Sequence, residues 1–312
     1  MAQIFVLGSF VVDLACYTPR LPKAGETVFA GPFKMGPGGK GSNQAIAASR
    51  AGGEVYFMTK LGSDDFGDMA RKTFIKENVD CRHVVEDMEH ETGAALIMVD
   101  KTTAENMITV SVGACNHITL AEVQACEQDI ADSKIFVTQL ETNIEAPLEG
   151  ISLARKHRVP TLLNPAPVQT LNHNIYPDIT YFTPNETEAS ELSGIEVTDI
   201  KSAEAAAGVF LARGVSNVVI TMGAEGAVVR NKDICEHVTA FNAGKAVDTT
   251  GAGDAFNGGF AVALAEGKEL LDAVRFGCAT AAIAVTKPGT AVSMPAREKI
   301  EALLAGIWSR TA

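Results

Sequence analysis

The sequence has no excess of positive charge and no long apolar run. Its 312 residues carry 26 Lys and Arg against 38 Asp and Glu, which gives a formal net charge of −12. Nucleic acids and anionic membrane surfaces both require a basic protein face, so this charge argues against both as partners. No stretch approaches the roughly 20 apolar residues of a membrane-spanning helix. We therefore expect a globular protein whose ligand is a small molecule.

Closely spaced cysteine pairs are also missing. The six cysteines lie far apart and none forms a Cys-x-x-Cys pair, so a structural zinc site is not expected. Scattered thiols are typical of a reducing compartment, which predicts a cytoplasmic protein. Residues 1–14 are apolar but lack a basic leader and contain Asp13, so they are interpreted as a first strand at 4–7 rather than a signal peptide.

Short β-branched runs alternate with helical patterns along most of the chain. The expected strands are 4–7, 55–60, 134–138, 160–164, 179–183 and 217–221. The expected helices are 42–50, 65–77, 120–130, 146–157, 202–213, 255–265, 270–286 and 296–308. This alternation predicts an α/β fold, with a mostly parallel central sheet and helices on both of its faces.

Two stretches interrupt the alternation. Residues 26–35 follow a Pro/Gly-rich turn, and residues 93–112 form two expected strands around a polar turn at 101–105. Neither is followed by a helix that could cross back over the main sheet, so both are assigned to a small antiparallel sheet that acts as a lid. With insertions at about 14–37 and 93–112, the chain 1–312 is expected to form a single domain.

The segment from Asp248 to Asp254, with sequence DTTGAGD, precedes an expected helix. Its small residues Gly251, Ala252 and Gly253 allow backbone N–H groups to converge at the helix N-terminus, where an anion is favoured. Asp254 then either caps the helix or accepts a proton beside a bound phosphoryl group. The spacing alone leaves both interpretations open.

Residues 36–43, GPGGKGSN, open an earlier helix. They are not a Walker A loop, because Lys40 is followed by Gly41 rather than by Ser or Thr. They contain Gly-x-Gly-x-x-Gly, but after lid-like sequence rather than after the first strand of a βαβ unit. A flexible hinge is an equally good interpretation in isolation. Lys40 and Asn43 favour a ligand site, because the glycines would let a ligand approach the backbone.

Further polar groups follow expected strands: Glu141, the segment 183–188 (TPNETE) and the segment 221–226 (TMGAEG). The carboxyl edge of a parallel sheet is where such folds bind ligands. On spacing alone, an ordinary helix cap is the favoured interpretation of 183–188, and a hairpin is the favoured interpretation of 221–226.

Taken together, these motifs resemble the ribokinase family of carbohydrate kinases over essentially the whole chain. The resemblance is carried by 38–45 (GGKGSNQA) with Gly52 and Gly62, by 164–167 (NPAP), by 183–188, and by 248–254 followed by 258–260 (GGF). It implies a Rossmann-like, three-layer domain closed by a β lid. It also implies ATP-dependent phosphorylation of the primary hydroxyl of a sugar.

The resemblance also implies roles for individual residues. The general base is Asp254, and the anion hole consists of Gly251, Ala252 and Gly253. The sugar-binding positions are Val11, Asp13, Gly39, Lys40, Asn43, Glu141 and Asp254. The ATP-binding positions are Asn185, Thr221, Gly223, Gly226, Gly253 and, beside the adenine, Cys278. The pair that organises Mg²⁺ indirectly is Asn185 and Glu188. An activating monovalent cation, K⁺, is implied at Asp248, Thr250, Ala284, Lys287, Gly289 and Ser293, mostly through backbone carbonyls.

One position departs from the family pattern. Members that phosphorylate ribose usually carry Asn two residues before the sugar-binding Asp13, whereas this chain has Val11. A buried sugar hydroxyl facing Val11 would lack a hydrogen bond, at a cost of about 1–3 kcal/mol. Members that phosphorylate 2-deoxyribose resemble this chain in having an apolar residue there. The expected acceptor is therefore the 5-hydroxyl of D-ribose or of 2-deoxy-D-ribose, unless Val11 merely packs beneath the sugar.

Other functions remain as alternatives at this stage. They are a kinase of another small sugar or a nucleoside, a sugar- or nucleotide-binding protein without catalysis, and a nicotinamide-dependent oxidoreductase. The apolar face of the lid strands could pair with a second copy, and the family resemblance implies a homodimer formed through the lid.

Overall fold

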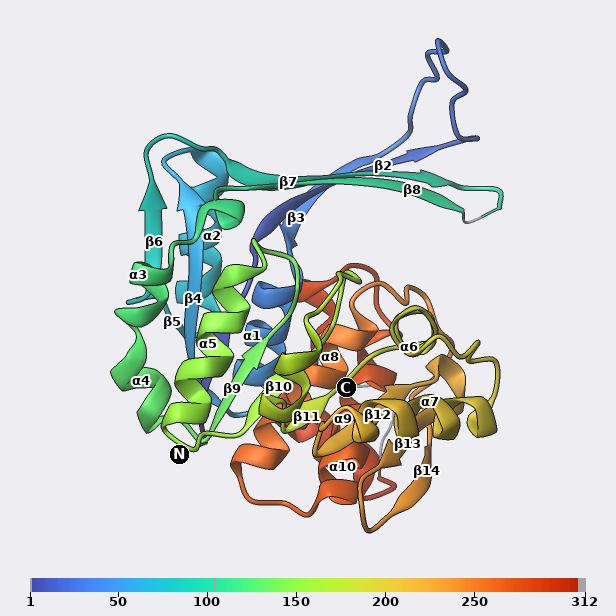
Figure 1. The fold of residues 1–312 in the computed structure, drawn as a ribbon. Helices are drawn as coiled ribbons and strands as arrows, with labels where there is room; N and C mark the ends of the chain where they lie inside the picture. The colour runs from blue at the N-terminus through green and yellow to red at the C-terminus, as the bar shows by residue number, and fades with distance from the viewer. Residues whose placement is uncertain (1, 104, 308–312) are drawn as a thin grey trace.

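The main sheet forms the middle layer of a three-layer domain (Figure 1). The computed structural model describes residues 2–103 and 105–307. In spatial order the strands are β14 (Cys235–Thr239), β13 (Gly226–Arg230), β12 (Asn217–Thr221), β11 (Tyr181–Phe182), β10 (Thr161–Leu163), β9 (Ile135–Thr138), β1 (Gln3–Leu7), β4 (Glu54–Gly62) and β5 (Val79–Asp80), with β6 (Val84–Asp87) also paired to β4. The strands from β12 to β5 are parallel, and β12, β13 and β14 pair antiparallel.

Both faces of this sheet are buried by helices. One core contains residues of α1 (Lys40–Arg50), α2 (Asp65–Lys76), α8 (Ala252–Ala265), α9 (Leu270–Ala284) and α10 (Arg297–Leu304). The other contains residues of α3 (Leu120–Gln124), α4 (Glu127–Asp132), α5 (Glu145–Lys156), α6 (Glu186–Ser193) and α7 (Ile200–Ala212). Alternate side chains of β1 enter the two cores, with Ile4 and Val6 in the first and Phe5 and Leu7 in the second. The predicted α/β fold is confirmed.

The lid is a second sheet that projects from the end of the main one (Figure 1). Its order is β3 (Phe33–Gly38), β2 (Val11–Thr18), β7 (Thr92–Asp100) and β8 (Asn106–Gly113). The expected antiparallel lid is wrong in one respect, because β2 and β7 pair in parallel and the sheet is mixed. The chain between β2 and β7 passes through β3, α1, β4, α2, β5 and β6, so the two strands are not joined by a hairpin and a parallel pairing is open to them. The strand expected at 26–35 lies at Phe33–Gly38 instead.

Two expected helices also differ in extent. The helix expected at 120–130 is divided into α3 and α4 by a turn at Ala125 and the buried Cys126, where Cys126 N donates to Val123 O three residues earlier. The helix expected at 296–308 corresponds to α10, and position 308 lies outside the described residues. No described helix is both long enough and apolar enough to cross a membrane.

The parallel strands β1, β9, β10, β11 and β12 end at a common edge, where α1 and α8 begin. The next residues after three of these strands are Gln139, Asn164 and Thr183, all of which are buried polar side chains. Buried polar groups from three neighbouring strands are therefore collected at this edge. The candidate site lies here.

Candidate active site

Asp254 lies in the first turn of α8 and is only 7% exposed. Its Oδ2 accepts a hydrogen bond from Asn43 Nδ2 at 3.0 Å, and its Oδ1 accepts one from Gln44 Nε2 at 3.0 Å. The N-cap is Gly251, at φ +78°, and it makes no side-chain capping bond. Asp254 is therefore not the N-cap of α8, and its carboxylate is held by side-chain amides from α1.

Ionisable groups crowd around Asp254. Burial raises the pKa of Asp254, while the Lys40 charge and the amide hydrogen bonds oppose that rise. Burial alone would lower the pKa of Lys40, but the negative charges of Asp254, Glu141 and Glu188 outweigh it and raise the pKa. Lys40 is thus held as a cation near Asp254, among the residues predicted to bind the sugar.

Two further predicted sugar-binding acids, Asp13 and Glu141, interact electrostatically with Asp254. Asp13 accepts a hydrogen bond from Thr290 Oγ1 at 3.2 Å, and burial together with neighbouring acids raises its pKa to about 6. Glu141 accepts hydrogen bonds from Ser9 Oγ at 2.5 Å and from the Lys40 backbone N–H at 2.8 Å. Both carboxylates have further lone pairs with which to accept hydrogen bonds from hydroxyl groups.

Val11 begins the lid strand β2 and is 2% exposed. It pairs with Gly38 on one side and Gly93 on the other, and a Cβ added to Gly93 would lie 2.9 Å from Val11 Cγ1. Gly39 has φ +90°, and a Cβ there would lie 2.8 Å from the Val11 nitrogen. The Val11 side chain is thus packed against the base of the lid, two residues from Asp13.

A cavity of about 140 Å³ opens beside Asp254 at the N-terminus of α8. A Cβ added to Gly253 would meet nothing within 4 Å, so this helix terminus faces open space. The cavity has the donors that an anion requires, namely a helix N-terminus and the Lys40 cation. The lining residues predicted from the sequence are Lys40, Asn185, Glu188, Thr221, Gly251, Ala252, Gly253 and Asp254. Those not predicted as site residues are Asn164, Ala166, Thr183, Thr249 and Asn257.

Asn185 and Glu188 form a capping box at the start of α6, with the Asn185 side chain accepting from Glu188 N and the Glu188 side chain accepting from Asn185 N. The capping interpretation of this motif is confirmed, and the same residues also line the cavity. Burial raises the pKa of Glu188. The described residues contain no group of three or more His, Cys, Asp or Glu that could hold a metal. A Mg²⁺ ion here would need phosphate oxygens as additional ligands, which is its common binding mode.

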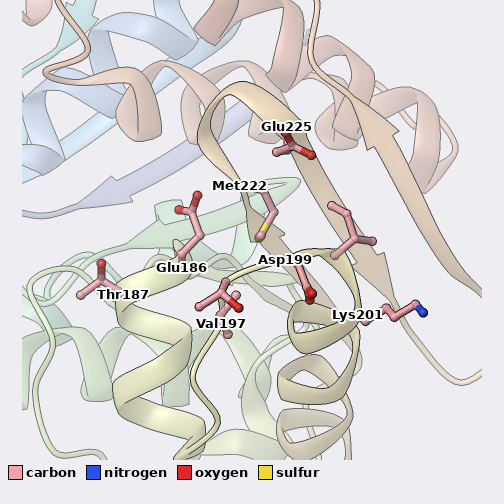
Figure 2. Close-up of a pocket in the computed structure, with 9 residues that line it drawn as sticks. Glu186, Thr187, Val197, Asp199, Lys201, Met222 and Glu225 are labelled. Atoms are coloured by element: carbon pink, nitrogen blue, oxygen red, sulfur yellow. The ribbon is translucent and has the colours of Figure 1, made fainter.

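A larger cavity of about 910 Å³ lies beyond the first turn of α6 (Figure 2). It is lined by the starts of α6 and α7 and by Met222 and Glu225 after β12. Its charged side chains are Glu186, Asp199, Lys201 and Glu225. Three carboxylates against one lysine do not suit a phosphate group, and Asp254 is absent from the lining. We therefore assign the phosphate-transfer site to the smaller cavity.

The segments predicted to hold a monovalent cation contact each other. Asp248 Oδ2 accepts from Gly289 N at 2.9 Å, Asp248 Oδ1 accepts from Thr250 N at 2.9 Å, and Ser293 N donates to Thr290 O at 3.0 Å. The Asp248 carboxylate thus links Thr250 to Gly289 and holds two of the predicted segments together. Ala284 and Lys287 are joined by a backbone hydrogen bond at the end of α9.

Three predicted nucleotide residues lie away from the small cavity. Gly223 and Gly226 form the turn that follows Thr221, where Met222 N donates to Gly226 O at 2.8 Å. The hairpin interpretation of this segment is confirmed, since β12 and β13 pair antiparallel across it. Cys278 is buried in α9, lines neither cavity, and has its pKa raised to about 12 by burial.

The sequence is similar to that of known carbohydrate kinases along nearly its whole length. The sequence pattern of the pfkB family carbohydrate kinases matches residues 1–297. The chain is 42% identical over 298 residues to a ribokinase of Haemophilus influenzae, covering 94% of this chain and 95% of that protein. It is 35% identical over 303 residues to a deoxyribokinase of Salmonella typhi, with coverages of 97% and 98%.

Solved structures agree with the fold. A ribokinase from Thermotoga maritima superimposes with a TM-score of 0.89 at 37% identity, covering 98% of this chain and all of that one. A ribokinase from Arabidopsis thaliana, complexed with ribose and ATP, superimposes with a TM-score of 0.92 at 29% identity, with coverages of 97% and 99%. The chain therefore belongs to the pfkB family of carbohydrate kinases, as its motifs and its lidded three-layer fold indicate.

Proposed function

We propose that this kinase transfers the γ-phosphoryl group of ATP to the 5-hydroxyl of a pentose, D-ribose or 2-deoxy-D-ribose, with Asp254 as general base. The observation that carries the proposal is the pairing of two features. A buried carboxylate lies in the first turn of α8, and the small residues that precede it open that helix terminus to a cavity. The carboxylate can remove the proton of the attacking hydroxyl group, and the open helix N-terminus can bind the negatively charged phosphoryl group.

In this proposal each residue has a physical task. Asp254 accepts the proton of the sugar hydroxyl as the oxygen attacks. The N–H groups of Gly251, Ala252 and Gly253, with Lys40, bind the phosphoryl oxygens on which negative charge is spread. Asp13 and Glu141 accept hydrogen bonds from sugar hydroxyls, Asn43 can both donate and accept, and Gly39 and Lys40 complete the polar sugar-binding positions that the family resemblance implies. The lid excludes water that would compete as acceptor.

The ATP and cation roles are those that the family resemblance implies. Thr221, Gly223 and Gly226 would contact the nucleotide, with Cys278 beside the adenine, and Asn185 and Glu188 would orient Mg²⁺ through its water and phosphate ligands. Bound Mg²⁺ supplies charge neutralisation on the phosphates. The contact between 248–250 and 284–293 would hold K⁺ near the anion hole, so that the cation stabilises the start of α8.

The sugar can be tested directly at Val11. In an ADP-release assay with Mg²⁺ and K⁺, we expect kcat/KM for 2-deoxy-D-ribose to exceed that for D-ribose. The reason is that a 2-hydroxyl beside Val11 would be buried without a partner, at about 1–3 kcal/mol, or roughly five- to more than a hundredfold. The Val11→Asn variant should shift the ratio towards ribose, because Asn can hydrogen-bond the extra hydroxyl.

The neighbouring buried Val12 supplies a control, because Val12→Ala alters the same strand without adding a hydrogen-bonding group. It should leave the ratio of the two sugars unchanged. Preference of the wild type for ribose, unaltered in Val11→Asn, would mean that Val11 only packs. Turnover of neither pentose, with turnover of a nucleoside or another sugar, would replace the pentose proposal.

A homodimer formed through the lid is the expected assembly. The lid carries exposed apolar side chains that water disfavours, among them Phe33, Met35, Leu96, Met107 and Ile108. Light scattering at micromolar concentration should give twice the 32.8 kDa chain mass. A Leu96→Lys variant should shift the mass towards the monomer, and a monomeric wild type would contradict the proposal.

We propose that the chain works as one domain with the lid strands as insertions, since the family match runs through both sheets without a break. A cytoplasmic location is consistent with the six free cysteines.

A further inference from the structure

A chain of buried side-chain amides runs from the end of β11 to Asp254. Asn164 Nδ2 donates to the main-chain carbonyl of Thr183 at 2.9 Å, and Asn164 Oδ1 accepts from Gln44 Nε2 at 3.1 Å. Gln44 Oε1 accepts from Gln139 Nε2 at 2.7 Å. Gln44 Nε2 also donates to Asp254 Oδ1 at 3.0 Å. All of these amide side chains are buried, so water does not compete for them.

The polarity of this chain is fixed at its far end. A main-chain carbonyl can only accept a hydrogen bond, so the Thr183 carbonyl requires Nδ2 of Asn164 to point towards it. The Oδ1 of Asn164 then points towards Gln44. Gln44 must then point its Nε2 at two acceptors, Asn164 Oδ1 and the Asp254 carboxylate. Its Oε1 is left for the Gln139 donor. A flipped Gln44 amide would place an oxygen against a carboxylate and lose three hydrogen bonds at once.

We infer that Gln44 is a positioning residue for Asp254, held in one orientation by Gln139 and Asn164 so that its amide fixes the carboxylate and favours the ionised form. The inference rests on the proposed role of Asp254 as general base. Each carboxylate oxygen has one amide donor, Asn43 on Oδ2 and Gln44 on Oδ1. Two donors fix the plane of the carboxylate and leave lone pairs on both oxygens for the sugar proton.

The surrounding charges explain why a neutral donor matters here. Asp254 faces one cation, Lys40, and three acids, Asp13, Glu141 and Glu188. Burial and the neighbouring acids raise the pKa of Asp254, while Lys40 and the amide donors lower it. Since only the ionised carboxylate can accept a proton, losing a donor should leave more of the enzyme in the inactive, protonated state.

The test is the pH dependence of kcat/KM for the sugar. Gln44→Met conserves volume but removes the donor. Its acid limb should move to higher pH by about one unit, the scale of one hydrogen bond to a charged group. Gln139→Met keeps the donor but frees its orientation, so its limb should move the same way by less. Gln124→Met makes the same chemical change on an exposed face of α3 and should leave the limb unmoved.

The outcomes separate this inference from the proposed function. A purely structural role for Gln44 would lower activity by the same factor at every pH, so a folded Gln44→Met protein with an unmoved limb overturns the inference. If Gln44→Met does not fold, the Gln139→Met profile decides, and an unmoved limb there has the same meaning. An active Asp254→Asn variant would instead overturn the base role itself. If Asp254→Asn is inactive and the acid limb of kcat/KM moves in Gln44→Met, the results support both the base role of Asp254 and the positioning role of Gln44.

Discussion

Replacing Asp254 by Asn is expected to lower kcat by about 10²–10⁴-fold, the usual contribution of a general base. The amide has nearly the same shape, so the cavity and the N-terminus of α8 should be preserved. It cannot accept the hydroxyl proton, and the attacking oxygen would have to lose that proton to water. ADP release in the presence of saturating pentose and ATP measures the loss, and calorimetric titration of ATP should show binding within a few-fold of wild type.

The matched control is Asp272→Asn, an exposed carboxylate on α9 that pairs with Arg275 at the surface. It should leave kcat unchanged. Because the pKa of Asp254 is raised, wild-type kcat/KM should fall with decreasing pH at values above the ordinary carboxylate range. Phosphoryl transfer by Asp254→Asn within a few-fold of wild type would contradict the proposed mechanism.

The parallel part of the sheet could be predicted because its strands are buried on both faces and read as continuous apolar runs. The expected strands 134–138 and 217–221 agree with β9 and β12 to within one residue. The lid was harder to predict because its central pairing joins Val11 to Gly93, far apart in the chain. No local pattern indicates whether such a pairing is parallel. The strand β14 and the break between α3 and α4 also depend on tertiary packing.

The candidate site was also predictable only in part. Its charged and glycine-rich positions were recognisable because they cluster in short motifs, and the structure brings Lys40, Asn185 and Asp254 to one cavity. Asn43, which holds one oxygen of Asp254, was predicted as well, and Gln44 lies in the same motif. The contacts that orient Gln44 were not predicted, since its partners Gln139 and Asn164 have no fixed spacing along the chain. They are neighbours only because β9 and β10 end at the same edge of the sheet. The ends of adjacent parallel strands were the signal that could have located them.

Replacing Gly41 by Ala is expected to destabilise the fold by about 2–4 kcal/mol. A Cβ at Gly41 would lie 2.6 Å from the Cα and carbonyl carbon of Gly8 and 2.6 Å from Ser9 N, all of them backbone atoms. A side chain could rotate away from such a contact, but backbone atoms cannot. The turn after β1 is also tied to α1, because Ser42 N donates to Ser9 O at 2.9 Å. Equilibrium unfolding in urea measures the change.

Gly36→Ala is the control for stability, because a Cβ there meets nothing within 4 Å and its φ is not positive. It should change the free energy of unfolding by less than about 1 kcal/mol. If Gly41→Ala were as stable and as active as the wild type, the close approach of the Gly8 and Gly41 backbones would not be required. A loss of stability would instead show that this approach holds the start of α1, with Lys40 and Asn43, against the turn that follows β1.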